Sequence, residues 1–132
     1  MDVQERIQQV WRVENRDNSG PYMGSSNIFK KLYIQFPEVC DWPGPFEGPK
    51  LAALFNDETI KGWFCGFGAL TEGSFSYKNW FRGVAARQFL HDQGFHIAQY
   101  HCQVQDVKEG LFQVMFRKSH AIRHTVIPCN FV

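Results

Sequence analysis

Residues 76–103 read SYKNWFRGVAARQFLHDQGFHIAQYHCQ, and this stretch decides the expected fold. Ser76 is a favoured helix N-cap residue, and apolar residues recur after it at three- and four-residue steps, which is typical of an amphipathic helix. These apolar residues are Tyr77, Trp80, Phe81, Val84, Ala85 and Phe89. Gly94 suits the left-handed backbone conformation that ends many helices. The pattern therefore predicts one main amphipathic helix over about 77–92.

Strand patterns lie on both sides of this helix. Residues 95–103 alternate between two faces, and so does a shorter segment at about 9–14, as expected for strands. The apolar residues 111–116 follow a polar stretch that ends in Gly110, so 95–103 and 111–116 are expected to form an antiparallel hairpin. The predicted fold class is α+β, a small and mostly antiparallel sheet packed by the helix at 77–92.

The remaining segments have weaker patterns. Residues 15–24 are rich in turn-forming residues, and residues 36–49 contain four prolines, which exclude a helix and indicate a long ordered loop. Residues 27–35 fit either a short helix or an edge strand, and the C-terminal tail fits a short helix or a last strand. A chain of 132 residues has the usual size of one domain, so residues 1–132 are expected to form one.

Composition narrows the classes of function. The formal net charge is only +1 with 44% hydrophobic residues, so the whole chain has no strong electrostatic attraction to nucleic acid. The four cysteines form no CxxC pair of the kind that binds zinc. The polar start MDVQERIQQ resembles no signal peptide, and no apolar run is long enough for a membrane span. We therefore expect reduced thiols, a cytoplasmic protein and no membrane partner.

Motifs for catalysis are missing from the sequence. It contains no GxSxG turn, P-loop or strand-linked GxGxxG segment. His120 and His124 have HxxxH spacing, but the motif lacks the glutamate of HExxH, so surface or packing roles are favoured for both. No metal and no cofactor are expected. Whether the chain is an enzyme stays open, with binding favoured over catalysis.

Arginines beside aromatic residues are the strongest candidates for ligand contacts, since the guanidinium fork matches two phosphate oxygens. Arg12 lies in the otherwise apolar segment VWRVE. Burial of its charge would require an anion or a partner such as Glu14. The alternative is that Arg12 lies on the exposed face of an edge strand, and the sequence leaves both possibilities open.

Three segments carry a resemblance to a known group of proteins: VWRVENRDNSGPYMG at 10–24, WFCGFGAL at 63–70, and the stretch from FLHDQGFHIAQYHC at 89–102 to EGLFQVMFRKSHA at 109–121. Together they resemble a pattern that recurs in small phage and prophage proteins. Within that group the chain looks like the Thoeris anti-defence proteins, which sequester cyclic ADP-ribose-like signals. A second resemblance is to anti-CRISPR proteins, which block a host effector by protein contact.

The resemblance implies a phage-encoded inhibitor of bacterial immunity that acts by binding. Its expected partner is a small nucleotide signal or, alternatively, a host defence protein, and a homo-oligomer is possible. An adenine would stack on a phenylalanine ring while arginines hold the phosphates. The candidate ligand-binding residues are Arg12, Tyr22, Phe64, Phe67, Phe81, Arg82, Gln113, Arg117 and Arg123. A looser similarity to ADP-ribosyltransferase-like folds would give Arg12 and Glu109 the binding and catalytic roles.

Overall fold

The computed structural model describes residues 6–15, 35–36, 63–73, 76–109 and 114–131. In these residues six strands form two antiparallel sheets of three strands each. The first sheet has the order β1-β3-β6, with β1 at Ile7–Glu14, β3 at His96–Gln103 and β6 at Ile122–Pro128. The second has the order β2-β5-β4, with bounds Trp63–Gly66 for β2, Val114–Arg117 for β5 and Val107–Glu109 for β4.

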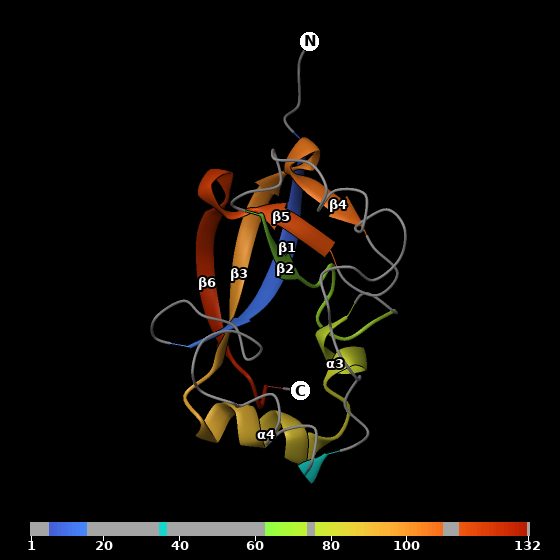
Figure 1. Ribbon diagram of the computed structural model, residues 1–132, viewed down its shortest axis with the longest axis vertical. Helices are drawn as coiled ribbons and strands as arrows, with labels where there is room; N and C mark the ends of the chain where they lie inside the picture. Colours follow the sequence, from blue (N-terminus) through green and yellow to red (C-terminus); the bar gives the residue numbers. More distant parts are fainter. Residues whose placement is uncertain (1–5, 16–34, 37–62, 74–75, 110–113, 132) are drawn as a thin grey trace.

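The α+β prediction is wrong, because the described chain is mostly β and no single helix packs its sheet. Helix α3 spans only Tyr77–Trp80, and α4 spans Val84–Asp92. The break between them occurs at Gly83, whose φ of 87° is incompatible with a continuous right-handed helix. Both helices lie at one end of the molecule, below the strands (Figure 1).

The apolar periodicity continued across this break for a physical reason. Trp80 and Phe81 are both buried, so the chain keeps its apolar residues in the core while it changes direction. The buried Arg87 donates a 2.8 Å hydrogen bond from Nη1 to the Phe81 carbonyl, which stabilises the turn. Two other details of this region are confirmed: Ser76 accepts a hydrogen bond from the Asn79 amide as N-cap, and Gly94 has a positive φ.

Strand pairing also differs from the expected hairpin. β3 pairs with β1 and β6, whereas β5 pairs with β2 and β4. β1 and β3 run antiparallel over eight residues, from Ile7 opposite Gln103 to Glu14 opposite His96. The 3-10 helix η2 at Val104–Asp106 redirects the chain between β3 and β4, which moves β4 and β5 into the second sheet.

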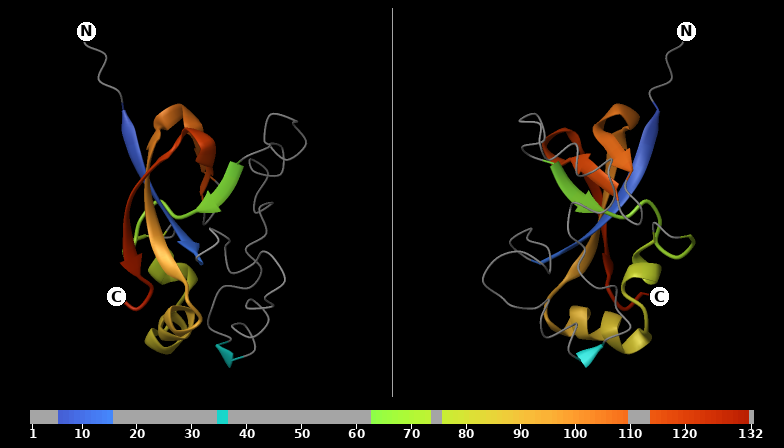
Figure 2. Two further views of the ribbon diagram at one scale, coloured as in Figure 1. Left: turned by 90° about the vertical axis from the view of Figure 1, so that its left-hand side faces the viewer. Right: turned by 45° about the vertical axis from the view of Figure 1, so that its right-hand side comes forward.

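The two sheets meet where β2 approaches β1. The amide of Trp11 donates to the Phe67 carbonyl at 2.9 Å, and the Phe67 amide donates to the Trp11 carbonyl at 2.7 Å. One core cluster fills the space between the sheets, and it includes Val10, Tyr100, Val114 and Phe116. A second cluster joins the helices to the lower part of the β1-β3-β6 sheet, as the two views of Figure 2 show for the ribbons.

Several expectations lie wholly or partly outside the described residues. They are the turn-rich segment at 15–24, the conformation of 27–35, the ordered loop at 36–49, the first half of the strand at 111–116, and the candidate ligand contacts of Tyr22 and Gln113. In the tail both alternatives occur, since the short 3-10 helix η3 at Lys118–His120 is followed by the last strand, β6.

Candidate anion-binding site

A buried carboxylate lies at the centre of the most highly charged group of described side chains. Glu14 ends β1, and its Oε2 is 2.8 Å from Arg12 Nη1 and 3.3 Å from Lys118 Nζ. Its other oxygen, Oε1, is 3.5 Å from Arg123 Nη2, within ion-pair distance but without a hydrogen bond. The hydroxyl of Tyr100 donates a 2.7 Å hydrogen bond to Oε2. We call these five residues the Glu14 cluster.

Strand alternation explains why these residues meet. Arg12 and Glu14 are two positions apart on β1, so their side chains lie on the same face. Lys118 begins the 3-10 helix η3 at Lys118–His120, which follows β5 directly. Arg123 lies on β6 opposite Tyr100 of β3. The cluster therefore combines groups from both sheets at their junction.

Exposure increases from one side of the cluster to the other. The side chain of Glu14 is 0% exposed and that of Arg12 is 5% exposed, while Lys118 reaches 23% and Arg123 reaches 41%. Three cations thus surround one carboxylate, and two of them extend to solvent. Arg12 and Lys118 each make further contacts besides these. Arg12 can be buried on β1 because Glu14 is buried beside it, since an isolated buried charge is strongly unfavourable.

The ring of Phe64 adjoins two of these cations. The guanidinium carbon of Arg12 and the ammonium of Lys118 are each 5.1 Å from the ring centroid, which is cation–π distance. Phe64 lies on β2 and is half-buried, packed against the core cluster between the sheets. An aromatic surface and cationic groups therefore lie side by side here.

His96 extends the cluster at the exposed end. Arg123 Nη2 is 2.8 Å from His96 Nε2, and the register places His96 opposite Glu14. Burial lowers the pKa of His96, and the positive charge of Arg123 lowers it further, against the raising effect of Glu14. A neutral ring can accept the hydrogen bond from Arg123, so His96 orients the guanidinium without adding charge.

Arg117 lies apart from this cluster. It is opposite Trp63 in the β2–β5 ladder, on the other face from the Phe64–Phe116 pair. Its guanidinium carbon is 5.2 Å from the Trp63 ring centroid, and its Nε is 3.9 Å from the Asp106 carboxylate. Arg12 and Arg123 are therefore brought together, whereas Arg117 belongs to a separate group with Trp63 and Asp106.

The other described candidates have different environments. Phe67 and Phe81 are core rings, 7% and 0% exposed, and they pack edge to face with centroids 6.0 Å apart. Arg82 is exposed and donates from Nε to the Asn79 carbonyl at 2.9 Å. Of the three candidate phenylalanine rings, Phe64 is the one that adjoins arginine and lysine.

Three of the five residues of the Glu14 cluster were named from the sequence, namely Arg12, Glu14 and Arg123. The possibility that Arg12 pairs with Glu14 is confirmed, and its signal was the two-residue spacing within a strand. Lys118 and Tyr100 of the cluster were missed, and so was the adjoining His96. They come from segments more than 80 positions away, and no spacing in the sequence connects them with Glu14.

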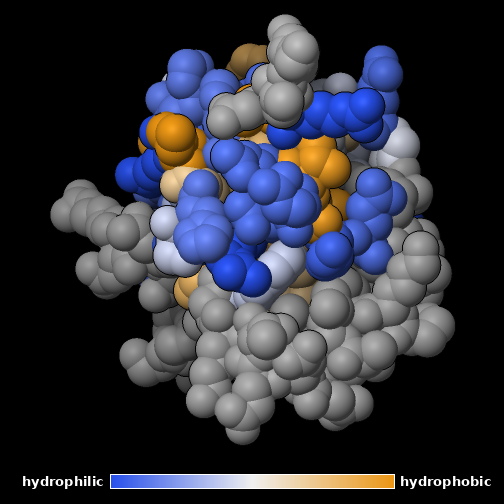
Figure 3. All heavy atoms as spheres, turned by 90° about the horizontal axis from the view of Figure 1, so that it is seen from above, coloured by the Kyte–Doolittle hydropathy of each residue, from blue (hydrophilic) through white to orange (hydrophobic). Residues whose placement is uncertain are grey.

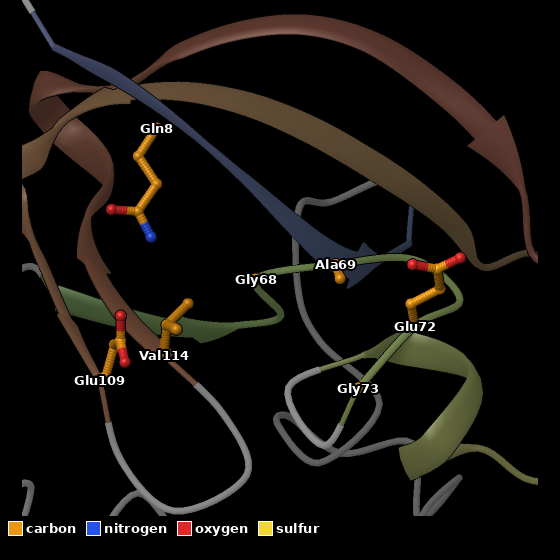
Figure 4. A pocket seen from close by; sticks show the side chains of 7 residues that line it. All are labelled: Gln8, Gly68, Ala69, Glu72, Gly73, Glu109 and Val114. Atoms are coloured by element: carbon orange, nitrogen blue, oxygen red, sulfur yellow. The ribbon is translucent and has the colours of Figure 1, made fainter.

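A cavity of about 230 Å³ lies elsewhere, between β1 and the turn that follows β2. Figure 4 shows Gln8 and Glu109 on one side of it and Glu72 on the other. Arg12 is not among its lining residues, and Glu109 is exposed. The two residues that an ADP-ribosyltransferase would need therefore belong to different sites.

Within the described ranges, no group of three or more histidine, cysteine or acidic residues has metal-binding geometry. No described helix has the length and apolar character needed to cross a membrane.

Comparison with curated proteins and with solved structures finds no match to this chain. A protein-family model, described as bacteriophage T4 Y00F protein, matches residues 3–130. Because this match covers nearly the whole chain, the protein belongs to the bacteriophage T4 Y00F protein family.

Proposed function

We propose that this phage-family protein acts by binding, and that its ligand is a nucleotide-type anion that contacts the Glu14 cluster. The observation that carries the proposal is the position of Arg123 and Lys118. Both converge on the same buried carboxylate, and their side chains are 41% and 23% exposed. Two fixed cations at a surface favour phosphate over a neutral ligand.

Glu14 supports this role by fixing the cations in advance. Long basic side chains lose conformational freedom when a ligand orders them, and this loss weakens binding. Here the ion pair with Glu14 and the contact with His96 already order Arg123. The partial exposure leaves part of its fork for an incoming phosphate oxygen, which makes the cluster a preorganised anion site.

Phe64 favours a nucleotide over inorganic phosphate. Its half-buried ring lies within 5.1 Å of Lys118 Nζ, so an aromatic face adjoins a phosphate contact. A purine can stack on an aromatic ring or on a guanidinium plane with a gain of about 1–3 kcal/mol. In a phage protein, sequestering such a signal would suppress a bacterial immune response, as the resemblance to Thoeris anti-defence proteins implies.

Thermal-shift and calorimetric titrations with cyclic ADP-ribose isomers and cyclic oligonucleotides test the proposal. A ligand at 100 times its Kd should stabilise the fold by about 2.7 kcal/mol. Arg123→Ala should reduce this stabilisation strongly, whereas Arg82→Ala, which removes an exposed arginine elsewhere, should leave it unchanged. If none of these nucleotides stabilises the native protein, sequestration is wrong.

A further inference from the structure

Strand β6 is the most exposed strand of the described fold. It pairs with β3 along one side, and no described strand pairs along its other side. Six of its seven residues are exposed, Ile127 alone being half-buried. The left view of Figure 2 shows β6 at the outer margin of its sheet. Its backbone is thus placed to pair with an additional strand.

Two apolar side chains of β6 are exposed on opposite faces. Ile122 is 70% exposed and lies opposite His101, while Val126 is 48% exposed and lies opposite Ala98. These two residues of β6 face opposite ways because the register shifts by one residue between Gln99 and Tyr100. Seen from above, the described surface is otherwise mainly hydrophilic, with apolar residues in separate patches (Figure 3). An added strand would cover parts of both faces, because its side chains alternate in the same way.

The charges around β6 identify the chemistry of a suitable partner. Residues 110–132 contain three Lys or Arg residues and two histidines but no Asp or Glu. Arg123 and His124 lie on β6 itself and are exposed, and Lys118 lies four residues before the strand, at the start of η3. Glu14, the carboxylate that pairs with Arg123 and Lys118, is fully buried. The exposed charges along this edge are therefore basic.

We propose that the β6 edge binds an extended acidic segment of a partner protein, which adds to the sheet as a fourth strand. Main-chain hydrogen bonds to β6 would supply affinity, and carboxylates facing Arg123 and Lys118 would supply selectivity. β6 is already paired with β3 from Ile122 to Pro128, with one register shift between Gln99 and Tyr100, so little ordering of this protein is needed. Arg123 and Lys118 also carry the nucleotide proposal, and the two proposals are distinguished by Ile122 and Val126, which only the added strand would cover.

Titration of the isotope-labelled full chain with designed peptides tests the proposal by NMR. The probe is a capped peptide of alternating Thr and Glu, about ten residues long, as in a long strand. A Thr–Lys peptide reverses the charge, and a Gly–Glu peptide keeps the charge but has low strand propensity. An oligothymidine of similar length tests nucleic acid as the occupant of the same edge.

The Thr–Glu peptide should shift the β6 amide signals and give cross-strand contacts to them, and the Thr–Lys peptide should do neither. Arg123→Gln should weaken this binding about tenfold, equivalent to one lost charged contact, while Arg82→Gln should not. The double variant Ile122→Ala, Val126→Ala changes only exposed side chains, so its fold should persist while its affinity falls.

Three results would overturn the proposal. The first is the absence of β6 shifts at millimolar Thr–Glu peptide. The second is equal binding of the Gly–Glu peptide with shifts at basic residues throughout the chain, which would indicate charge attraction alone. The third is tighter binding of oligothymidine than of peptide at β6. A nucleotide that binds equally well to the Ile122–Val126 double variant would leave the sequestration proposal intact in each case.

Discussion

The hydroxyl of Tyr100, in the middle of β3, donates a 2.7 Å hydrogen bond to Glu14 at the end of β1, 86 positions earlier. Burial raises the pKa of this tyrosine, and the hydrogen bond to the carboxylate raises it further. The phenol therefore remains a donor at every physiological pH. Tyr100 and the cations together make a buried carboxylate possible at the junction of the two sheets.

Neutralising Glu14 should strongly destabilise the fold. Glu14→Gln keeps the size of the side chain but leaves the buried Arg12 without its carboxylate at 2.8 Å. Removing one partner of a buried ion pair costs several kcal/mol, and we expect a loss of about 3 kcal/mol because Lys118 and Arg123 can be rehydrated. Urea unfolding measures the change, with the exposed Glu109→Gln as control. A loss below about 1 kcal/mol would contradict a structural role.

A side chain at Gly66 should disturb the contact between β2 and β1. A Cβ there would lie 2.7 Å from Val10 Cγ1 and 2.9 Å from the Trp11 carbonyl oxygen. Overpacking of this kind costs about 1–3 kcal/mol, so Gly66→Ala should lower the free energy of unfolding by that amount. Gly73→Ala is the matched comparison, because no atom lies within 4 Å of its Cβ and only its positive φ is unfavourable. Equal losses would show that the close approach is unimportant.

Tyr77 should stabilise the C-terminal end of the chain through one hydrogen bond. Its hydroxyl donates to the Cys129 carbonyl at 2.7 Å, and both residues are fully buried. Tyr77→Phe leaves that carbonyl without its donor, which should cost about 1–3 kcal/mol. Ser119→Ala, which removes an exposed hydroxyl, provides the control in the same denaturation experiment. An unchanged midpoint for Tyr77→Phe would rule out this stabilisation.

Stability should depend on pH through His96. Its pKa in the folded state is lowered below 6.5 by burial and by Arg123, so the unfolded chain binds the proton more readily. The free energy of unfolding should therefore fall as the pH drops below about 6.5. His96→Asn should make this pH dependence shallower between about pH 7 and 5, whereas the exposed His91→Asn should not. Identical pH profiles for wild type and His96→Asn would be inconsistent with the lowered pKa.

Two thiols should resist alkylation in the native protein. Burial raises the pKa of Cys102 to about 11 and that of Cys129 to about 12. At about pH 8 both are protonated, and the thiolate is the reactive form. Iodoacetamide labelling followed by mass spectrometry should modify them slowly, at a rate that follows unfolding. Both should react rapidly in urea, and rapid labelling without denaturant would show that the thiols are accessible.

Local patterns predicted individual elements well. Alternation placed strands close to β1 and β3, and the N-cap and glycine signals at Ser76 and Gly94 lie where the helical region begins and ends. These signals succeeded because they concern the backbone of neighbouring residues. The predicted strand pairing was wrong, because η2 carries β4 and β5 into the second sheet. The predicted single helix was wrong, because Gly83 divides it without interrupting the apolar pattern.

The sequence by itself determined the strand at Arg12 and Glu14, their shared face, and the need for a partner if the arginine is buried. Only the tertiary structure decided that Tyr100, Lys118 and Arg123 complete the cluster and that Arg117 belongs to another face. The physical reason is that charge pairing depends on distance in space. Strand order and the junction of two sheets set that distance, and residues far apart in the chain carry no common spacing that reveals it.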